Sequence, residues 1–224
     1  EDASGNSDEA SFNITITDTT NPQFMQVPNG ISVSSDQGDC GAIVTWLEVT
    51  ASDNCAVESI TGTHASGDFF NKGLTVVEHT VTDIHGNQIT QSFDINVTDN
   101  ELPVITGIDQ NLTIENDLGQ CGANVTWQEP TASDNCEVTS LTVNIPSGAF
   151  FSEGTTLVTY TTSDDSGNEN TKSFNVTVQD LELPSFTSIP ESVIAETTTN
   201  SCSGIATWDT VMGTDNCLVD SIVS

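Results

Sequence analysis

The chain has 224 residues, of which 33 are Asp or Glu and only Lys72 and Lys172 are basic, so its formal net charge at pH 7 is −31. Such a charge repels phosphate backbones and anionic bilayers, which excludes nucleic acid and acidic membrane surfaces as partners. No run approaches the roughly 18 apolar residues of a membrane-spanning helix, so no direct membrane insertion is expected. Two interpretations of the charge stay open: a solubilising surface, or the binding of cations.

An internal repeat of 81 residues organises the chain. The recurring residues are Cys40, Cys121 and Cys202, then Trp46, Trp127 and Trp208, then Cys55, Cys136 and Cys217. We predict complete repeats at residues 19–99 and 100–180. The C-terminal end of a truncated repeat precedes them at 1–18, and the N-terminal part of a further repeat follows at 181–224. This division indicates a piece of a longer protein built from tandem modules.

The predicted elements of each repeat are short strands, and no segment shows a helical stripe. Residues 75–81 and 156–162 are rich in Thr and β-branched residues. Three stretches alternate polar residues with apolar ones, namely with Phe93, Ile95 and Val97, with Val125 and Trp127, and with Phe174, Val176 and Val178. A period of two predicts strands with one buried face. Together with frequent turn signals and one Trp per unit, it predicts an all-β chain of tandem immunoglobulin-like antiparallel β-sandwich repeats.

These residues resemble the hyalin repeat, or HYR, family of immunoglobulin-like extracellular modules. The motifs occur in the family's order in both complete repeats. In the second they are Cys-Gly-Ala with Val-Thr-Trp (121–127), Pro-Thr-Ala-Ser-Asp-Asn-Cys (130–136), Ser-Gly-Ala-Phe-Phe-Ser-Glu-Gly (147–154), Asp-Asp-Ser-Gly-Asn (164–168) and Phe-Asn-Val-Thr-Val-Gln-Asp (174–180). Arrays of this kind with few basic residues look like those of giant surface adhesins and filaments of Bacteroidota. The resemblance implies an extracellular or cell-surface adhesion role and transfers no catalytic residue.

The cysteines form three pairs of equal spacing, which points to an oxidising, extracellular compartment. The pairs are Cys40 and Cys55, Cys121 and Cys136, and Cys202 and Cys217. A disulfide within each repeat is the preferred interpretation, and closing a loop of this size contributes about 3 kcal/mol. It requires the chain to fold straight back after Trp127. If the chain instead runs on into the opposite strand, the pairing must be between repeats.

Acidic residues recur at three places in the repeat and predict a Ca²⁺ site at the seams between repeats. They are Asp18, Asp99 and Asp180 in the linkers, followed by Glu101 and Glu182, then Asp53 and Asp134 in the loop before the second cysteine, and Asp83 and Asp164 in the last hairpin. Ca²⁺ takes six to eight oxygen ligands, which linker and loops together can supply. The competing interpretation is that each Asp closes a turn by accepting backbone hydrogen bonds. The linker pairs of Asp and Glu beside Pro favour the cation, which would make the linker stiff.

The leading functional hypothesis is a segment of an extracellular multi-repeat cell-surface adhesin or filament that serves as a stiff stalk. Its expected partners are a protein or glycan ligand outside the cell and the neighbouring repeats of the same chain. One alternative is a carbohydrate- or protein-binding accessory module of a secreted enzyme. Another is a self-assembling extracellular fibre subunit. No catalytic activity is expected, because no Ser and His recur in matching places and the recurring acids lie in linkers and hairpins.

Overall fold

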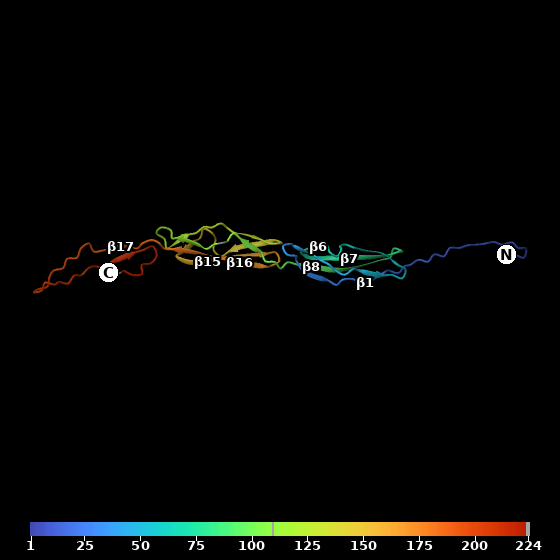
Figure 1. Ribbon diagram of the computed structural model, residues 1–224, viewed down its shortest axis with the longest axis horizontal. Helices are drawn as coiled ribbons and strands as arrows, with labels where there is room; N and C mark the ends of the chain where they lie inside the picture. The colour runs from blue at the N-terminus through green and yellow to red at the C-terminus, as the bar shows by residue number, and fades with distance from the viewer. Residues whose placement is uncertain (109, 223–224) are drawn as a thin grey trace. The chain divides into compact units, whose positions relative to one another are not determined.

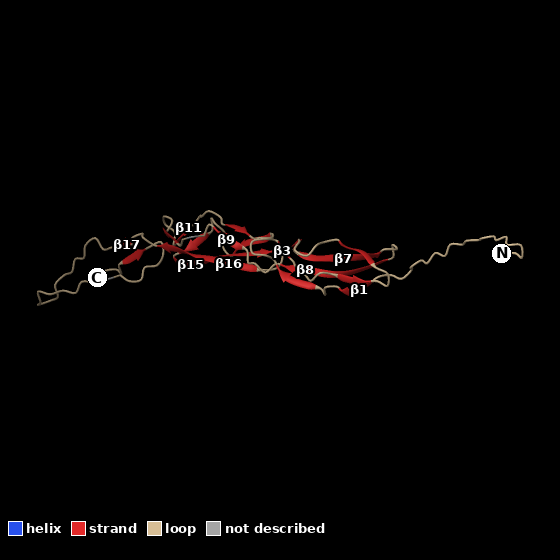
Figure 2. Cartoon of the chain, turned by 45° about the vertical axis from the view of Figure 1, so that its right-hand side comes forward, coloured by secondary structure: helices blue, strands red, loops and turns tan. Residues whose placement is uncertain are grey.

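The computed structural model describes residues 1–108 and 110–222, and in this part of the chain every regular element is a β-strand (Figure 2). The chain divides into two compact units, Glu1–Glu101 and Leu102–Ser224. None of the described residues belongs to a helix long and apolar enough to cross a membrane.

The first unit is built on a four-stranded sheet in the order β2-β8-β7-β5. Figure 1 labels its two long strands, β7 and β8. The four strands are β2 (Ile31–Ser34), β5 (Val57–Gly62), β7 (Gly73–Asp83) and β8 (Gln88–Thr98). Two short antiparallel pairs accompany it. They are β1 (Gln23–Gln26) with β4 (Thr50–Ser52), and β3 (Gly41–Ile43) with β6 (Phe69–Asn71).

The second unit repeats this arrangement 81 residues later, with a sheet in the order β10-β16-β15-β13. Its strands are β9 (Val104–Thr106), β10 (Leu112–Glu115), β11 (Gly122–Asn124), β12 (Thr131–Ser133), β13 (Val138–Val143), β14 (Phe150–Ser152), β15 (Gly154–Asp164) and β16 (Glu169–Gln179). One further antiparallel pair follows, formed by β17 (Ser185–Ser188) and β18 (Met212–Thr214).

The alternation read from the sequence places the core. Three side chains of β8 and three of β16 are at most 6% exposed, namely Phe93, Ile95, Val97, Phe174, Val176 and Val178. Antiparallel pairing sets Val77 of β7 opposite Phe93, and the other face of the hairpin stays in solvent. Burying one face of each long strand is what a period of two requires. The prediction of tandem all-β sandwich repeats is confirmed.

Two details differ from the expectation. The sheets are not wholly antiparallel, because β2 runs parallel to β8 and β10 runs parallel to β16. These strands are distant in the sequence and no hairpin joins them, so nothing constrains them to antiparallel pairing. In addition, the stretch with Val125 and Trp127 leaves the ladder after Asn124 and continues as an irregular segment beside residues 147–149.

The three recurring tryptophans have different environments. Trp46 and Trp127 pack edge-on against Phe93 and Phe174, with ring centroids 5.3 Å apart in both cases. Trp208, the third tryptophan of the repeating set, is 64% exposed. It lies between β17 and β18, where no long hairpin of the kind made by β7 and β8 is present among the described residues to receive its ring.

Candidate acidic and disulfide sites at the ends of the repeats

Three acidic side chains converge in the first unit. Each of Asp18, Asp53 and Asp83 offers a carboxylate oxygen, and these oxygens lie within 4.8 Å of one another. They come from three separate segments: the linker, the loop after β4 and the end of β7. The structure thus brings together one member of each recurring acidic class.

Asp83 is fully buried and closes the turn between β7 and β8. Its Oδ1 accepts the backbone N–H groups of His85 and Asn87 at 2.8 and 2.9 Å, and its Oδ2 accepts the Asn87 side-chain amide at 2.8 Å. Gly86 supplies the positive φ of 90° that the turn requires. Burial acts to raise the pKa of Asp83, but the Asn87 and His85 donors outweigh it and the pKa is lowered. Asp83 is therefore a carboxylate at neutral pH.

Asp18 and Asp53 each keep one oxygen without a donor. Asp18 Oδ1 accepts the N–H of Thr20 at 3.0 Å and the Asn54 amide at 3.2 Å, and Asp53 Oδ2 accepts the N–H of Cys55 at 2.8 Å. Asp18 Oδ2 and Asp53 Oδ1 are buried and accept no hydrogen bond. The Thr20 donor, opposed by burial and aided by Asn54, lowers the pKa of Asp18. A buried carboxylate oxygen without a donor is costly and indicates a missing positive partner.

Softer ligands lie beside this cluster. His85 Nδ1 is 3.7 Å from Asp18 Oδ2, and Asp18, Cys55 and His85 also have ligand atoms within 4.8 Å of one another. Burial and the neighbouring Asp18 raise the pKa of the Cys55 thiol, so at neutral pH it is protonated and a weaker metal ligand. Position 85 is Ser166 in the next repeat, so this softer set does not recur.

The linker glutamates bind backbone donors of the repeat before them. Glu101 Oε1 accepts the N–H of Gly38 at 2.7 Å. Glu182 Oε1 accepts the N–H of Gly119 at 2.6 Å and the side-chain amide of Asn116 at 3.1 Å. The structure therefore places these two predicted ligands on the turns at Gly38 and Gly119, and neither belongs to the group formed by Asp18, Asp53 and Asp83.

The remaining predicted acids repeat the local geometry of the first set. Asp164 accepts from Ser166 and Asn168 as Asp83 does from its own turn. Asp134 Oδ2 accepts the N–H of Cys136, as Asp53 does with Cys55.

Two linker aspartates complete the predicted set. Asp99 is 5% exposed and its Oδ1 accepts the N–H of Glu101. Asp180 Oδ1 accepts the N–H of Glu182 and, at 3.1 Å, the amide of Asn216. Each linker Asp thus accepts the backbone N–H group two residues further along the chain, as a turn-forming Asp does.

The disulfide in the second unit joins Cys121 to Cys217, 96 residues apart, with a Cα–Cα distance of 4.6 Å. The expected bridges within the repeat are therefore wrong for all three pairs: Cys121 with Cys136, Cys202 with Cys217, and Cys40 with Cys55, because Cys55 is a free thiol. The reason lies in the path after β11: β12 pairs with β9 and not with β11, so the chain runs on and carries Cys136 away. This is the arrangement in which the pairing must be between repeats.

The other cysteines fall into two groups. Cys40 and Cys136 are also disulfide-bonded, and Cys55 and Cys202 are free and exposed.

Polar contacts surround the Cys121–Cys217 bond. The Asn216 side-chain amide, next to Cys217, donates to the backbone oxygen of Gln120, next to Cys121, at 2.9 Å. Glu182 and Asp180 hold the linker at the same place through the contacts given above. The second complete repeat and the segment that follows it are thus joined by one covalent bond and several hydrogen bonds.

A buried polar position inside the core differs between the repeats. In the second, Trp127 Nε1 donates to Tyr160 Oη at 2.8 Å, and Tyr160 donates to Glu129. In the first, His79 takes the place of Tyr160, is 8% exposed and has a buried Nδ1 without a partner. Burial lowers the pKa of His79. The alternation of residues along β7 places His79 on the buried face, and this was the signal in the sequence that its side chain is buried. The signal was missed because no His recurs at the repeat period.

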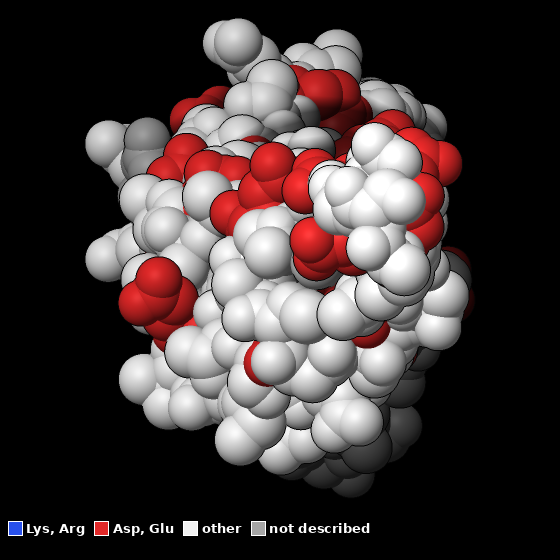
Figure 3. Space-filling model, turned by 90° about the vertical axis from the view of Figure 1, so that its right-hand side faces the viewer, with Lys and Arg blue, Asp and Glu red and all other residues white. Residues whose placement is uncertain are grey.

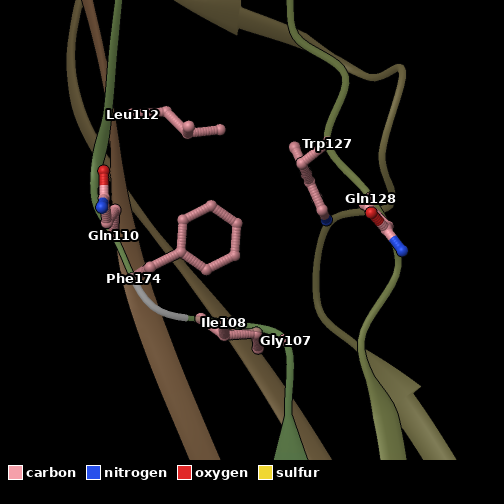
Figure 4. Close-up of a pocket in the computed structure, with 7 residues that line it drawn as sticks. All are labelled: Gly107, Ile108, Gln110, Leu112, Trp127, Gln128 and Phe174. Atoms are coloured by element: carbon pink, nitrogen blue, oxygen red, sulfur yellow. The ribbon is translucent and has the colours of Figure 1, made fainter.

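The hollow beside Trp127 and Phe174 is a gap at the edge of the core (Figure 4). Its volume is about 240 Å³, and the side chains that line it carry no charge among the described residues. Ligand pockets usually measure roughly 300–1,000 Å³ and contain a few convergent polar groups. The hollow therefore gives no support to a carbohydrate-binding module.

Acidic groups dominate the charged part of the surface, since the chain has 33 Asp and Glu against two Lys. On the face drawn in Figure 3, Asp and Glu side chains form several patches and no Lys or Arg of the described residues is visible. A surface of this sign attracts cations.

The HYR domain family matches residues 17–97 and 98–178. Among curated proteins, hyalin of Lytechinus variegatus is 36% identical over 206 residues, which make up 88% of this chain and 39% of hyalin. "Sushi, von Willebrand factor type A, EGF and pentraxin domain-containing protein 1" of Rattus norvegicus is 31% identical over 166 residues, or 72% of this chain and 5% of that protein. The chain thus spans well under half of these relatives. Neither is bacterial, so the resemblance to filaments of Bacteroidota gains no support.

Solved structures of tandem cadherin domains are similar at a lower level. Drosophila N-cadherin EC1-4 has a TM-score of 0.34 and 13% identity, covering 71% of this chain and 50% of that one. Protocadherin gammaB7 EC3-6 has a TM-score of 0.36 and 17% identity, covering 88% and 56%. At these scores the likeness carries no argument about function.

Proposed function

Because the chain belongs to the HYR domain family, we propose that it is a segment of an extracellular adhesion or matrix protein whose tandem repeats form a stiff stalk, braced by Ca²⁺ and by disulfides. The observation that carries the calcium proposal is the convergence of Asp18, Asp53 and Asp83, two of which keep a buried oxygen without a donor. The observation that carries the stalk proposal is the covalent and polar junction around Cys121 and Cys217.

A cation explains the acidic cluster better than turn formation alone. Turn formation accounts for one oxygen of Asp18 and one of Asp53, and it leaves the second oxygen of each buried and unpaired. Hydrogen bonds lower the pKa of Asp18 and Asp83, so protonation does not relieve the repulsion between the carboxylates at neutral pH. A bound cation satisfies the free oxygens and removes the repulsion in one step.

Ca²⁺ is the cation that this donor set favours. All three converging side chains offer carboxylate oxygens, which suit a hard cation with flexible geometry, and backbone carbonyls or water complete its six to eight ligands. Zn²⁺ prefers nitrogen and sulfur, and here it would need His85 and Cys55 beside Asp18. The oxygen-donating residues recur in the second repeat, as Asp134 and Asp164, whereas His85 does not.

Bracing the linker is the mechanical role of the site. Asp18 belongs to the linker, and it is held against the loop of the repeat that follows through Asn54. A cation that also ligates Asp53 and Asp83 would fix the linker to two further points of that repeat. A stalk needs such fixed junctions, because an array of modules joined by free linkers behaves as a flexible chain.

Thermal melting of the oxidised full chain tests the calcium proposal. With Ca²⁺ at about 100 times its Kd, the stability should rise by about 2.7 kcal/mol relative to the chelated chain, with a matching rise in Tm. Asp53→Asn should lose most of this response. Asp94→Asn removes the same charge from an exposed position of β8 and should keep it. Equal Tm values with Ca²⁺ and with chelator would overturn the calcium proposal, and a response to Zn²⁺ alone would replace it with the softer site.

NMR relaxation tests the stiffness of the linkers. Backbone order parameters at residues 99–101 and 180–182 should be near 0.85, the value of rigid backbone, in the oxidised Ca²⁺-loaded chain. Values below about 0.6 under these conditions would show free linkers and contradict the stalk.

A further inference from the structure

A cavity of about 360 Å³ lies in the first repeat, beside the buried His79. The polar residues that line it are Trp46, Glu48, His64, Ser66 and His79. Its volume falls within the roughly 300–1,000 Å³ of small-molecule sites, which combine an apolar wall with a few convergent polar groups. None of the converging carboxylates of the candidate calcium cluster lines the cavity, so it is a separate site.

The second repeat shows what occupies the equivalent place there. Tyr160 Oη accepts a hydrogen bond from Trp127 Nε1 at 2.8 Å and donates one to Glu129. A hydroxyl group is both a donor and an acceptor, so it can connect an indole N–H with a carboxylate. The residues at the positions equivalent to 60, 62 and 64 pack against the core: Leu141, Val143 and Ile145. In the second repeat the chain itself therefore fills this place.

The first repeat holds its tryptophan in the same frame. The Trp46 backbone N–H donates to Ser66 Oγ at 2.8 Å, and Ser66 Oγ donates to the Trp46 carbonyl at 3.0 Å. The equivalent bonds between Trp127 and Ser147 measure 2.9 and 3.0 Å. In both repeats the indole packs edge-on against the Phe of the long hairpin, with the ring centroids 5.3 Å apart. The two indole rings therefore have the same setting.

The hydroxyl group is what the first repeat lacks. His79 replaces the tyrosine of the second repeat, and its imidazole carries no hydroxyl. In the described part of the chain, the hydrogen bonds of Trp46 go only to its backbone, and Glu48 makes none. His79 is only 8% exposed, and its Nδ1 is buried without a partner. Gly62 stands where the second repeat has a valine, and a Cβ there would lie 2.8 Å from His79 Nε2, so the missing side chain adds to the space.

We propose that this cavity binds a small neutral saccharide, with one sugar hydroxyl at the place that Tyr160 Oη has in the second repeat. The hydroxyl accepts from the Trp46 indole N–H and donates to the Glu48 carboxylate. Further sugar hydroxyls suit the imidazoles of His64 and His79, because burial lowers the pKa of His79 and keeps its ring neutral at pH 7. This binding role is additional to the stalk and does not depend on it.

Other small ligands fit the lining less well. An alkylammonium group has three donors and no acceptor, so it leaves the Trp46 indole N–H without a partner. An anion is repelled by the Glu48 carboxylate and by the net charge of −31. A transition metal needs ligand atoms that lie close together. Glu48, His64 and His79 do not form one of the groups, among the described residues, whose ligand atoms lie within 4.8 Å of one another.

NMR titration of the oxidised full chain tests the proposal. Each tryptophan has its own indole N–H signal, so Trp46 reports on the cavity. Trp127, whose indole N–H is bonded to Tyr160, is the internal control. Glucose, galactose and N-acetylglucosamine are added separately up to about 100 mM, because a single sugar ring binds with a Kd in the millimolar range. At least one of the three should shift the Trp46 signal along a saturating curve and leave the Trp127 signal in place.

Two variants remove the site in different ways. His79→Tyr introduces the tyrosine of the second repeat and should abolish the shift, because its hydroxyl takes the place of the sugar between Trp46 and Glu48. Glu48→Ala removes the acceptor from an exposed position and should raise the Kd at least about tenfold. Glu58→Ala is the matched control: it removes the same charge from an exposed position of β5 outside the cavity and should leave the Kd unchanged. The Tm of each variant checks that it is folded.

Three results would overturn the proposal. An unmoved Trp46 signal with all three sugars would show that the cavity holds only water. A Kd that is unchanged in Glu48→Ala and His79→Tyr would place the binding elsewhere. An equal shift by glycerol at the same concentration would show that any hydroxyl suffices and that no sugar ring is recognised. The titrations are run in Ca²⁺ and in chelator, and the Trp46 response should be the same in both, so failure of the calcium proposal leaves this test intact.

Discussion

The disulfide between Cys121 and Cys217 should be a large part of the stability of the second unit. In the chain-entropy account, closing a loop of about 96 residues disfavours the unfolded chain by about 4.7 kcal/mol, against about 3 kcal/mol for a 15-residue loop. The longer loop matters because the unfolded chain loses more conformations when more distant points are joined. Replacing Cys217 by Ser should therefore raise the unfolding equilibrium constant by roughly three powers of ten.

Urea unfolding followed by tryptophan fluorescence measures this change. The oxidised chain and Cys217→Ser are compared at equal protein concentration, with the free energies extrapolated to water. Cys202→Ser is the matched control, because it removes a cysteine from the same segment but breaks no bond among the described residues. The control should unfold within about 0.5 kcal/mol of the parent chain, since surface substitutions usually have effects of this size.

Two results would refute the reasoning. A loss of stability in Cys217→Ser no larger than in Cys202→Ser would show that the bond does not constrain the unfolded chain. Recovery of a peptide that links Cys121 to Cys136 from the oxidised chain would show that the bond is within the repeat.

Three further predictions follow from individual positions. Burial lowers the pKa of His79, so as the pH falls below 6.5 the unfolded chain takes up a proton before the folded chain does. The first repeat should therefore lose stability as the pH falls from 6.5 to the folded pKa of His79. Thermal melting between pH 7.5 and 5 should show this loss, and His79→Tyr should abolish it. A Cβ on Gly41 would overlap the backbone oxygen of Phe70, so Gly41→Ala should cost about 1–3 kcal/mol in urea unfolding, whereas Gly30→Ala, with its nearest atom 3.7 Å away, should cost little. Under force, the Cys121–Cys217 bond should hide about 320 Å of extended chain, which a reductant releases in single-molecule stretching.

The strands were predictable because their signal is local. Phe93, Ile95 and Val97 alternate along one segment, and a buried face of period two is visible without knowledge of its partner. The parallel pairing of β2 with β8 was not predictable in the same way. It depends on which edge of the sheet a distant strand occupies, and neither strand carries a residue that specifies this.

The disulfide pairing illustrates a limit of repeat analysis. A step of 15 residues within a repeat and a step of 96 residues between repeats are equally compatible with a period of 81, so the period alone does not choose between them. The choice is made by the path from β11 to β12, which pairs with β9. Val125 and Trp127 alternate with polar residues on that path, but the regular strand ends at Asn124, so the periodic signal did not show where the chain goes next.

The repeat pattern identified the linker acids, but the sequence did not distinguish the roles that they have in the structure. Glu182 and Asp180 are both carboxylates beside Pro184, and composition gives them the same chemistry. In the structure Glu182 accepts backbone and amide hydrogen bonds from the turn at Gly119, and Asp180 accepts from Asn216. Only the position of donors that lie 36 or more residues away distinguishes the two.

This division of tasks explains how a linker of three residues is held without Gly or Ser. Asp180 is bound to the loop of the segment that follows, through Asn216, and Glu182 is bound to the turn of the repeat that precedes, at Gly119. The two side chains leave the same short linker and fix it from both sides, so neither half of the junction rotates without breaking a hydrogen bond to a carboxylate, the stronger kind. The turn that donates to Glu182 leads directly into Cys121, and the loop that donates to Asp180 leads directly into Cys217. The hydrogen bonds therefore hold the two sulfurs close together before the disulfide forms, and the disulfide in turn makes that arrangement permanent.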